Sequence, residues 1–172
     1  MPRIHPLLAL FVALAACAEP AAQRSAPTDA IAVDIRGVSI DRRNSSPVVL
    51  LEEVAGDRVL PIWIGSFEAS SIQAVIDSRE PPRPNTHDLA KRLLVGLDAT
   101  IEQVTVTELR GNTYYAVVRV LANREAREID ARPSDAIAMA LRFDAPVYVA
   151  GALFDEQAGR ADEREPADEI RL

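Results

Sequence analysis

The segment TIEQVTVTELRGNTYYAVVRVL, residues 100–121, indicates the fold class more directly than any other part of the chain. Two runs rich in β-branched and aromatic residues, 100–109 and 113–121, flank the tripeptide Arg110-Gly111-Asn112. A short segment with glycine and asparagine between two such runs is typical of a β-hairpin. The sequence therefore predicts two antiparallel strands joined by a tight turn.

The same signals occur on both sides of this hairpin. Residues 31–40 alternate between apolar and polar types around Gly37, which predicts a strand with a bulge. The apolar runs 48–54 and 59–64 are separated by a short turn and predict a second hairpin. Two further short strands are predicted, at residues 125–130 and 147–149.

Three helices are predicted between these strands. Ser66, Thr86 and Ser134 stand at the helix starts, where a side-chain oxygen can cap free backbone N–H groups. The second helix has apolar residues at helical spacing, and its predicted inner face consists of Leu89, Leu93, Leu94 and Leu97. The pattern as a whole predicts an α+β fold: a single domain over residues 31–154 with a largely antiparallel mixed sheet and about three helices.

The first 30 residues differ from this domain. Residues 1–16 combine Arg3 with an apolar run of about 10 residues, which is typical of a signal peptide and too short to span a bilayer. The run ends in Leu14-Ala15-Ala16-Cys17, which resembles a bacterial lipoprotein signal. Ordinary cleavage after Ala18 and a chance alanine-rich leader are the alternatives.

The lipoprotein interpretation predicts where the mature chain would be. Cys17 would carry the lipid, and residues 17–30 would form a flexible tether to the domain. The anchor would hold the protein on the periplasmic side of the cell envelope, at the outer membrane, without a transmembrane helix in the mature chain.

Charge restricts the possible partners. The formal net charge of the chain is −7, so it has no general electrostatic attraction to nucleic acid or anionic lipid. Any contact with DNA or RNA must therefore come from a local patch. Residues 155–172 contain seven acids and three arginines without apolar periodicity, which predicts an acidic disordered tail.

Two segments place acids, hydroxyls and arginines at predicted helix starts: Arg83-Pro84-Asn85-Thr86-His87-Asp88-Leu89 and Ile129-Asp130-Ala131-Arg132-Pro133-Ser134-Asp135-Ala136. Metal-dependent cleavage of a phosphodiester needs carboxylates for a hard cation, a group that activates water, and positive charge near the phosphate. The candidate ligands for Mg²⁺ or Mn²⁺ are Asp88, Asp130, Asp135 and, in third place, Glu68.

The remaining polar residues of these segments complete the predicted site. His87 is a candidate base or metal ligand, since its ordinary pKa lies near working pH. Together with Asp88 and Asp135 it forms the predicted catalytic set. Arg83 and Arg132 would bind phosphate oxygens through their planar guanidinium groups. The helix N-termini near Thr86 and Ser134 would offer backbone N–H groups to the same phosphate.

Each of these residues also has a purely structural interpretation. Asp88 and Asp135 fall in first helical turns, where the helix dipole alone favours acids by about 0.3–1 kcal/mol. Asp130 and Arg132 would form an ion pair that fixes the loop, and His87 would be a hydrogen-bonded core residue. Capping alone requires neither the arginines nor His87, and this favours a site.

Five ordered blocks give the chain a family resemblance. They are Leu60-Pro61-Ile62-Trp63-Ile64-Gly65, Glu68-Ala69, Arg83 to Leu89, Thr113-Tyr114-Tyr115-Ala116 and Ile129 to Ala138. Across residues 34–150 the chain resembles the bifunctional nuclease domain. The resemblance implies an α+β domain that forms oligomers and acts on both DNA and RNA.

Two functions of different classes follow from these observations. The first is a metal-dependent nuclease that cleaves DNA or RNA at the two polar segments. The second is a non-catalytic binding module of the cell envelope, which would use the same polar cleft for a small anion or its sheet surface for a protein. The acidic net charge and the predicted export signal favour the second.

Overall fold

The computed structural model describes residues 29–162, which form one seven-stranded sheet with four helices. The strands are β1 (Ala30–Asp41), β2 (Ser46–Glu53), β3 (Val59–Trp63), β4 (Ala99–Arg110), β5 (Thr113–Ala122), β6 (Glu125–Ala131) and β7 (Val147–Ala150). The helices are α1 (Ser66–Ile76), α2 (Thr86–Gly96), α3 (Pro133–Phe143) and α4 (Gly151–Asp162). The α+β class and the single domain are confirmed.

The sheet consists of two antiparallel units that the short strand β7 joins. Its strand order is β3-β2-β1-β7-β4-β5-β6. β7 pairs antiparallel with β1 and parallel with β4, and all the other pairs are antiparallel. The predicted hairpins β2–β3 and β4–β5 are therefore confirmed, as is the largely antiparallel mixed sheet.

Local backbone conformations explain the turn and the bulge. Gly37 has a φ of 146° and lies where the register between β1 and β2 shifts, so the predicted bulge is confirmed. In the β4–β5 turn Gly111 and Asn112 both have positive φ, at 53° and 67°. Glycine and asparagine adopt this left-handed conformation at the lowest cost, which is why this tripeptide closes the hairpin.

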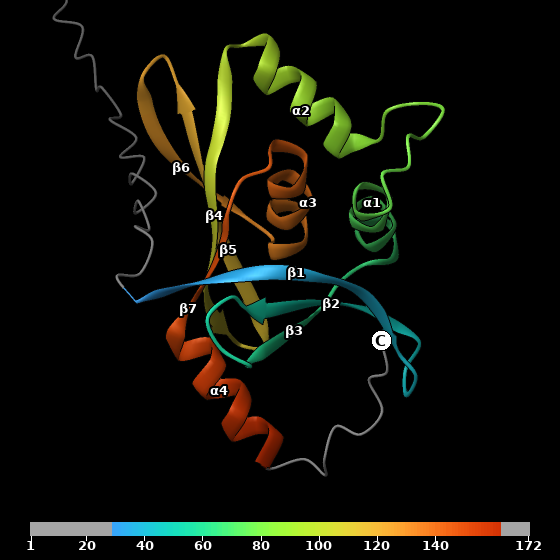
Figure 1. The fold of residues 1–172 in the computed structure, drawn as a ribbon, viewed down its shortest axis with the longest axis vertical. Coiled ribbons are helices and arrows are strands. Elements are labelled where there is room, and N and C mark those ends of the chain that lie inside the picture. Colours follow the sequence, from blue (N-terminus) through green and yellow to red (C-terminus); the bar gives the residue numbers. More distant parts are fainter. Residues whose placement is uncertain (1–28, 163–172) are drawn as a thin grey trace, which may run out of the picture.

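Both faces of the sheet are covered. Val48 and Val49 are neighbours in β2 whose side chains point to opposite faces, and both are fully buried. Figure 1 shows α1, α2 and α3 together on one side of β1–β3, with α4 on the other side. Ile72 of α1 and Ile137 of α3 are fully buried on their side, and Leu153 and Phe154 bring α4 into the same core.

The helix starts differ from the prediction in their capping residues. The N-cap residues are Gly65, Asn85 and Arg132 instead of Ser66, Thr86 and Ser134. Among these three only Asn85 caps through its side chain, which accepts a hydrogen bond from the backbone N–H of Asp88 (3.0 Å). Helix α3 begins with Pro133, which has no N–H group to cap.

Two further expectations are wrong. The predicted inner face of α2 is mostly exposed: Leu89, Leu93 and Leu97 face solvent, and only Leu94 packs against the core. The predicted disordered tail begins within a helix, since residues 155–162 continue α4. The first turn of α4 carries the buried Leu153 and Phe154, which attach this acidic helix to β7 and the sheet.

The remaining predictions about the chain ends lie outside residues 29–162. These are the signal peptide, the lipidated Cys17, nearly all of the tether and the last ten residues. Within the described residues no helix is long and apolar enough to cross a membrane. The lipid anchor and the oligomeric state stay predictions.

Candidate functional site

The candidate site lies where the first turns of three helices meet. Glu68, Asp88 and Asp135 are each the third residue of their helix, in α1, α2 and α3 respectively. Helix α3 packs against both α1 and α2, which brings these turns together. A helix N-terminus carries partial positive charge, so three of them together favour acids and bound anions.

Glu68, His87, Arg132 and Asp135 form one connected group, called here the acid–arginine cluster. Arg132 donates from Nε to Asp135 Oδ2 (2.7 Å) and from Nη2 to Asp135 Oδ1 (2.9 Å). The same Nη2 donates to Glu68 Oε1 (2.7 Å), so a single nitrogen joins the two carboxylates. The Nε2 atom of His87 lies 3.2 Å from Asp135 Oδ1. The cluster thus connects all three helices.

The cluster is open to solvent on its arginine side. The side chain of Arg132 is 65% exposed and that of Asp135 is 34% exposed, whereas Glu68 is 17% exposed. Gly65 leaves room for Glu68, because a Cβ at this position would collide with Glu68 Oε2. A ligand that reaches the cluster would therefore meet Arg132 first and the carboxylates behind it.

A second, buried group lies directly behind His87 and is called here the Arg142 network. Arg142 is 5% exposed and donates from Nε to Asp88 Oδ1 (2.8 Å) and from Nη2 to Ser71 Oγ (2.9 Å). Asn85 also donates to Ser71 Oγ, at 3.1 Å. Ser71 Oγ lies 2.9 Å from Nδ1 of His87, so the network and the cluster share this histidine.

Three carboxyl groups of the site have a pKa below their ordinary value. Partial burial raises the pKa of Asp135, but hydrogen bonds from Arg132 and His87 outweigh it. For Asp88, burial likewise raises the pKa, and the Asn85 backbone N–H and Arg142 lower it further than burial raises it. The pKa of Glu68 is lowered by its own backbone N–H and then by Arg132. All three are therefore ionised at neutral pH.

The structure brings together four of the predicted site residues. His87 and Asp135, which are 48 positions apart, are in contact, and Glu68 and Arg132 join them. This confirms the expectation that the two polar segments converge.

The other predicted residues lie elsewhere or have other partners. Asp88 has both oxygens occupied, by Arg142 and by the Asn85 backbone. Asp130 is exposed on β6, paired in register with Val117. Arg83 is exposed in the loop before α2, Thr86 is exposed, and Ser134 is buried at the start of α3.

The predicted set of four metal ligands, Asp88, Asp130, Asp135 and Glu68, does not gather in this arrangement. No group of three or more His, Cys, Asp or Glu residues within 29–162 is arranged to hold a metal ion. Glu68 and Asp135 are the two members that share a partner, Arg132 Nη2. Magnesium is often bound by one or two carboxylates together with water and substrate phosphate, so two carboxylates are not too few for it, but here both are hydrogen-bonded to Arg132.

Three polar residues contact the predicted site residues but were not among the predicted ones: Ser71, Asn85 and Arg142. One signal was available for Asn85, because an asparagine three residues before Asp88 matches a capping box. Ser71 and Arg142 lie inside helices at ordinary positions, and nothing in their local sequence indicates partners 16 and 54 positions away.

Asn85 also yields a test of how α2 begins. Replacing Asn85 by alanine is expected to lower the free energy of unfolding by at least about 1 kcal/mol, because the cap to Asp88 is lost. The matched variant Thr86→Ala should change it by less than about 0.5 kcal/mol, since Thr86 is exposed and does not cap. Chemical denaturation measures both values, and equal losses would contradict this assignment of the cap.

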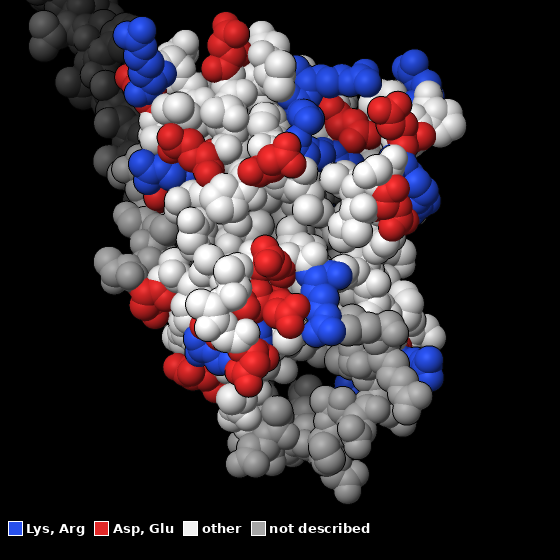
Figure 2. All heavy atoms as spheres, viewed as in Figure 1, with Lys and Arg blue, Asp and Glu red and all other residues white. Residues whose placement is uncertain are grey.

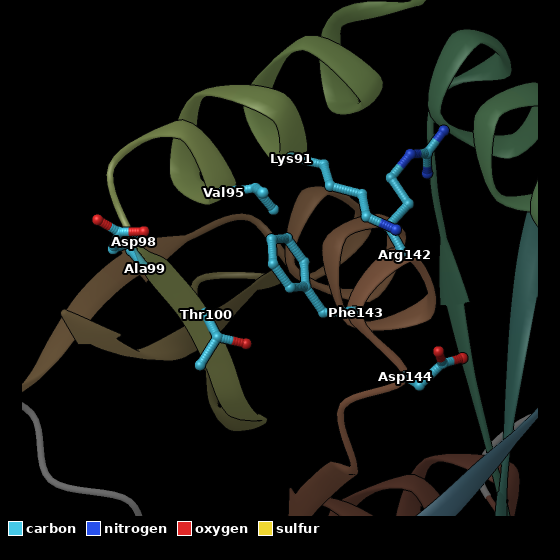
Figure 3. Close-up of a pocket in the computed structure, with 8 residues that line it drawn as sticks. All are labelled: Lys91, Val95, Asp98, Ala99, Thr100, Arg142, Phe143 and Asp144. Atoms are coloured by element: carbon cyan, nitrogen blue, oxygen red, sulfur yellow. The ribbon is translucent and has the colours of Figure 1, made fainter.

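A separate hollow of 470 Å³ lies at the other end of α2 and α3. Figure 3 shows Phe143 at its centre, beneath Val95, and the Arg142 side chain extending away from Phe143 toward α1. Lys91, Asp98, Ala99, Thr100 and Asp144 complete the lining. None of the predicted site residues lines it. We therefore place the candidate site at the acid–arginine cluster and not at this hollow.

One face of the molecule has mixed charge. Figure 2 shows acidic and basic side chains interspersed over the face seen in Figure 1, without a broad region of one sign. This agrees with the net charge of −7, from which the sequence predicts only local attraction to nucleic acid.

Comparisons with known proteins agree with the resemblance. Residues 49–162 match the family described as the bifunctional nuclease domain. An uncharacterized protein of Mycobacterium tuberculosis is 41% identical over 127 residues, which cover 74% of this chain and 75% of that protein. Bifunctional nuclease 1 of Oryza sativa subsp. indica and Bifunctional nuclease of Oryza minuta are each 27% identical over 113 residues, which cover 62% of this chain and 34% of those proteins.

Proposed function

Because the chain belongs to the bifunctional nuclease domain family, we propose that it hydrolyses phosphodiester bonds in DNA or RNA at the acid–arginine cluster. The observation that carries the proposal is the position of Arg132, an exposed arginine held by two carboxylates where three helix N-termini meet. A phosphate would find an arginine and the positive ends of three helix dipoles at one point.

Arg132 would bind the phosphate by exchanging partners. Its guanidinium group now satisfies Asp135 and Glu68, and its exposure leaves it free to turn toward a phosphate oxygen. The planar group matches two phosphate oxygens as well as it matches two carboxylate oxygens. Arg83, exposed in the loop before α2, would contact a neighbouring phosphate of the same strand.

Asp135 and Glu68 would then face the scissile bond. A carboxylate whose pKa is lowered is a weak base, so Asp135 is better suited to orient water or hold a cation than to keep a proton. We also propose that Mg²⁺ or Mn²⁺ takes part, with Asp135 and Glu68 as the residues that hold it. The ion would offset the negative charge that develops on the phosphate.

The test is a cleavage assay on the full chain. Single-stranded DNA and RNA would be incubated with the protein in Mg²⁺, in Mn²⁺ and in EDTA. Cleavage in either metal that EDTA abolishes is the expected result. A chain that cuts equally well in EDTA would contradict the metal part of the proposal, and a chain that cuts neither substrate would contradict the nuclease itself.

A non-catalytic binding module is the second candidate function, and one observation favours it. Within the described residues every buried side-chain nitrogen and oxygen has a hydrogen-bond partner, so none of these buried atoms requires a ligand. Such a module would bind a small anion at Arg132, in the cell envelope if Cys17 is lipidated. Saturable binding of inorganic phosphate by a chain that cleaves neither DNA nor RNA would support this function over the first.

A further inference from the structure

We propose that Ser71 is a positioning residue that fixes His87 in one tautomer, so that His87 serves the site as a hydrogen-bond donor to Asp135 and not as a base. The role of the histidine in cleavage rests on the proposed function. The hydrogen-bond geometry of Ser71 does not rest on the proposed function, and it can be tested separately. The inference follows from counting donors and acceptors around Ser71 Oγ.

The orientation of the Asn85 amide determines whether Asn85 presents a hydrogen-bond donor or an acceptor to Ser71 Oγ. The Oδ1 atom of Asn85 accepts from the backbone N–H of Asp88 (3.0 Å) and from Arg142 Nη2 (3.4 Å). The reversed amide would point its own N–H₂ group at these two donors. Asn85 therefore presents Nδ2, a donor, to Ser71 Oγ.

Ser71 Oγ is consequently surrounded by two obligatory donors. Arg142 Nη2 lies 2.9 Å away and Asn85 Nδ2 lies 3.1 Å away, and neither atom can accept a hydrogen bond. A hydroxyl has two lone pairs and one hydrogen, so both lone pairs are used. The hydrogen must point to the remaining neighbour, Nδ1 of His87, at 2.9 Å.

The tautomer of His87 follows directly. Nδ1 accepts from Ser71 and so carries no proton in the neutral ring, which places the proton on Nε2. Nε2 then donates to Asp135 Oδ1, at 3.2 Å. A base needs a free lone pair beside the substrate, but the lone pair of this ring faces Ser71, a buried residue of α1.

The same count excludes Ser71 as a nucleophile in this arrangement. The chain Ser71–His87–Asp135 has the residue types of a hydrolase triad, which the sequence alone does not indicate. Both lone pairs of the serine oxygen are occupied, and the residue is buried. Its role is instead to connect the Arg142 network to the histidine ring, and through the ring to the carboxylate of Asp135.

The first experiment is ¹⁵N NMR of the imidazole nitrogens in the full chain. The chain has two histidines, His5 and His87, so the background variant His5→Gln leaves one signal set. For a neutral His87 we expect a protonated Nε2 and an unprotonated Nδ1. Ser71→Ala should move the Nδ1 resonance, Ser71→Thr should restore it, and Ser70→Ala, an exposed neighbour, should not change it.

A proton on Nδ1, or an Nδ1 resonance that does not respond to Ser71→Ala, would overturn the inference whether or not the protein cleaves nucleic acid.

The second experiment tests whether His87 acts as a hydrogen-bond donor or as a base. The amide of His87→Gln can still donate to Asp135, so this variant should retain cleavage that His87→Ala loses by about 10–100-fold. Equal losses in the two variants would overturn the donor role.

Discussion

The variant Arg142→Ala is expected to lose about 3–5 kcal/mol of its free energy of unfolding, a large effect for a single residue. Arg142 is 5% exposed and is the cationic partner of Asp88 in the Arg142 network. Removing it leaves a partly buried carboxylate without that partner and leaves Ser71 with one fewer donor. The loss comes from unpaired groups and not from the pair's own strength.

Two further variants test whether unpaired groups cause this loss of stability. Arg142→Met retains the apolar stem of the side chain but no charge, so it should recover only the packing part of the loss. Arg119→Ala breaks an exposed ion pair with Glu102 on the sheet and should cost less than about 1 kcal/mol. Denaturant unfolding of the three variants gives the comparison. An Arg142→Met variant as stable as the natural chain would show that the buried charges are not what matters.

In the cleavage assay the variant Asp135→Asn is expected to lose about 100-fold or more of the activity. Asp135 is the residue that both Arg132 and His87 contact, and its negative charge organises the acid–arginine cluster. Asparagine has nearly the same shape but cannot hold a cation or pair with Arg132 as a carboxylate does. The expected defect is therefore in activity, with secondary structure unchanged by circular dichroism.

The matched control is Asp130→Asn. This aspartate lies five positions earlier in the same segment, but it is exposed on β6. Its replacement should leave cleavage unchanged. An equal loss in both variants would show that the charge of the whole segment matters, and the assignment of the site to the cluster would then be wrong.

Much of the fold follows from local sequence, because turns and alternation are local. The β4–β5 hairpin could be predicted since its tripeptide supplies the positive φ angles that the turn needs. Helix α4 could not be predicted in the same way. Its burial depends on Leu153 and Phe154 in the first turn, and two apolar residues do not make a periodic pattern.

The candidate site was predictable in part for a similar reason. His87 and Asp135 stand at helix starts, where sequence signals are strong, and the helices are neighbours in the fold. The contact of Asp88 with Arg142 was not predictable, because it depends on how α2 packs on α3. The leucines of α2 were predicted to be buried, because their spacing is that of an apolar helix face. Most of them are exposed, because the helix lies at the edge of the core.

The position of β7 has a consequence for how the chain acquires its shape during synthesis. Strand β7 is only four residues long and lies near the end of the domain. It pairs with both β1 and β4 and so joins the two antiparallel units of the sheet. Glu68 follows the β1–β3 unit and comes before β7 by almost half the chain. Its partner Arg132 follows the other unit, β4–β6. A nascent polypeptide therefore cannot complete the acid–arginine cluster until Ala150 has left the ribosome, and Glu68 lacks its partner Arg132 until then.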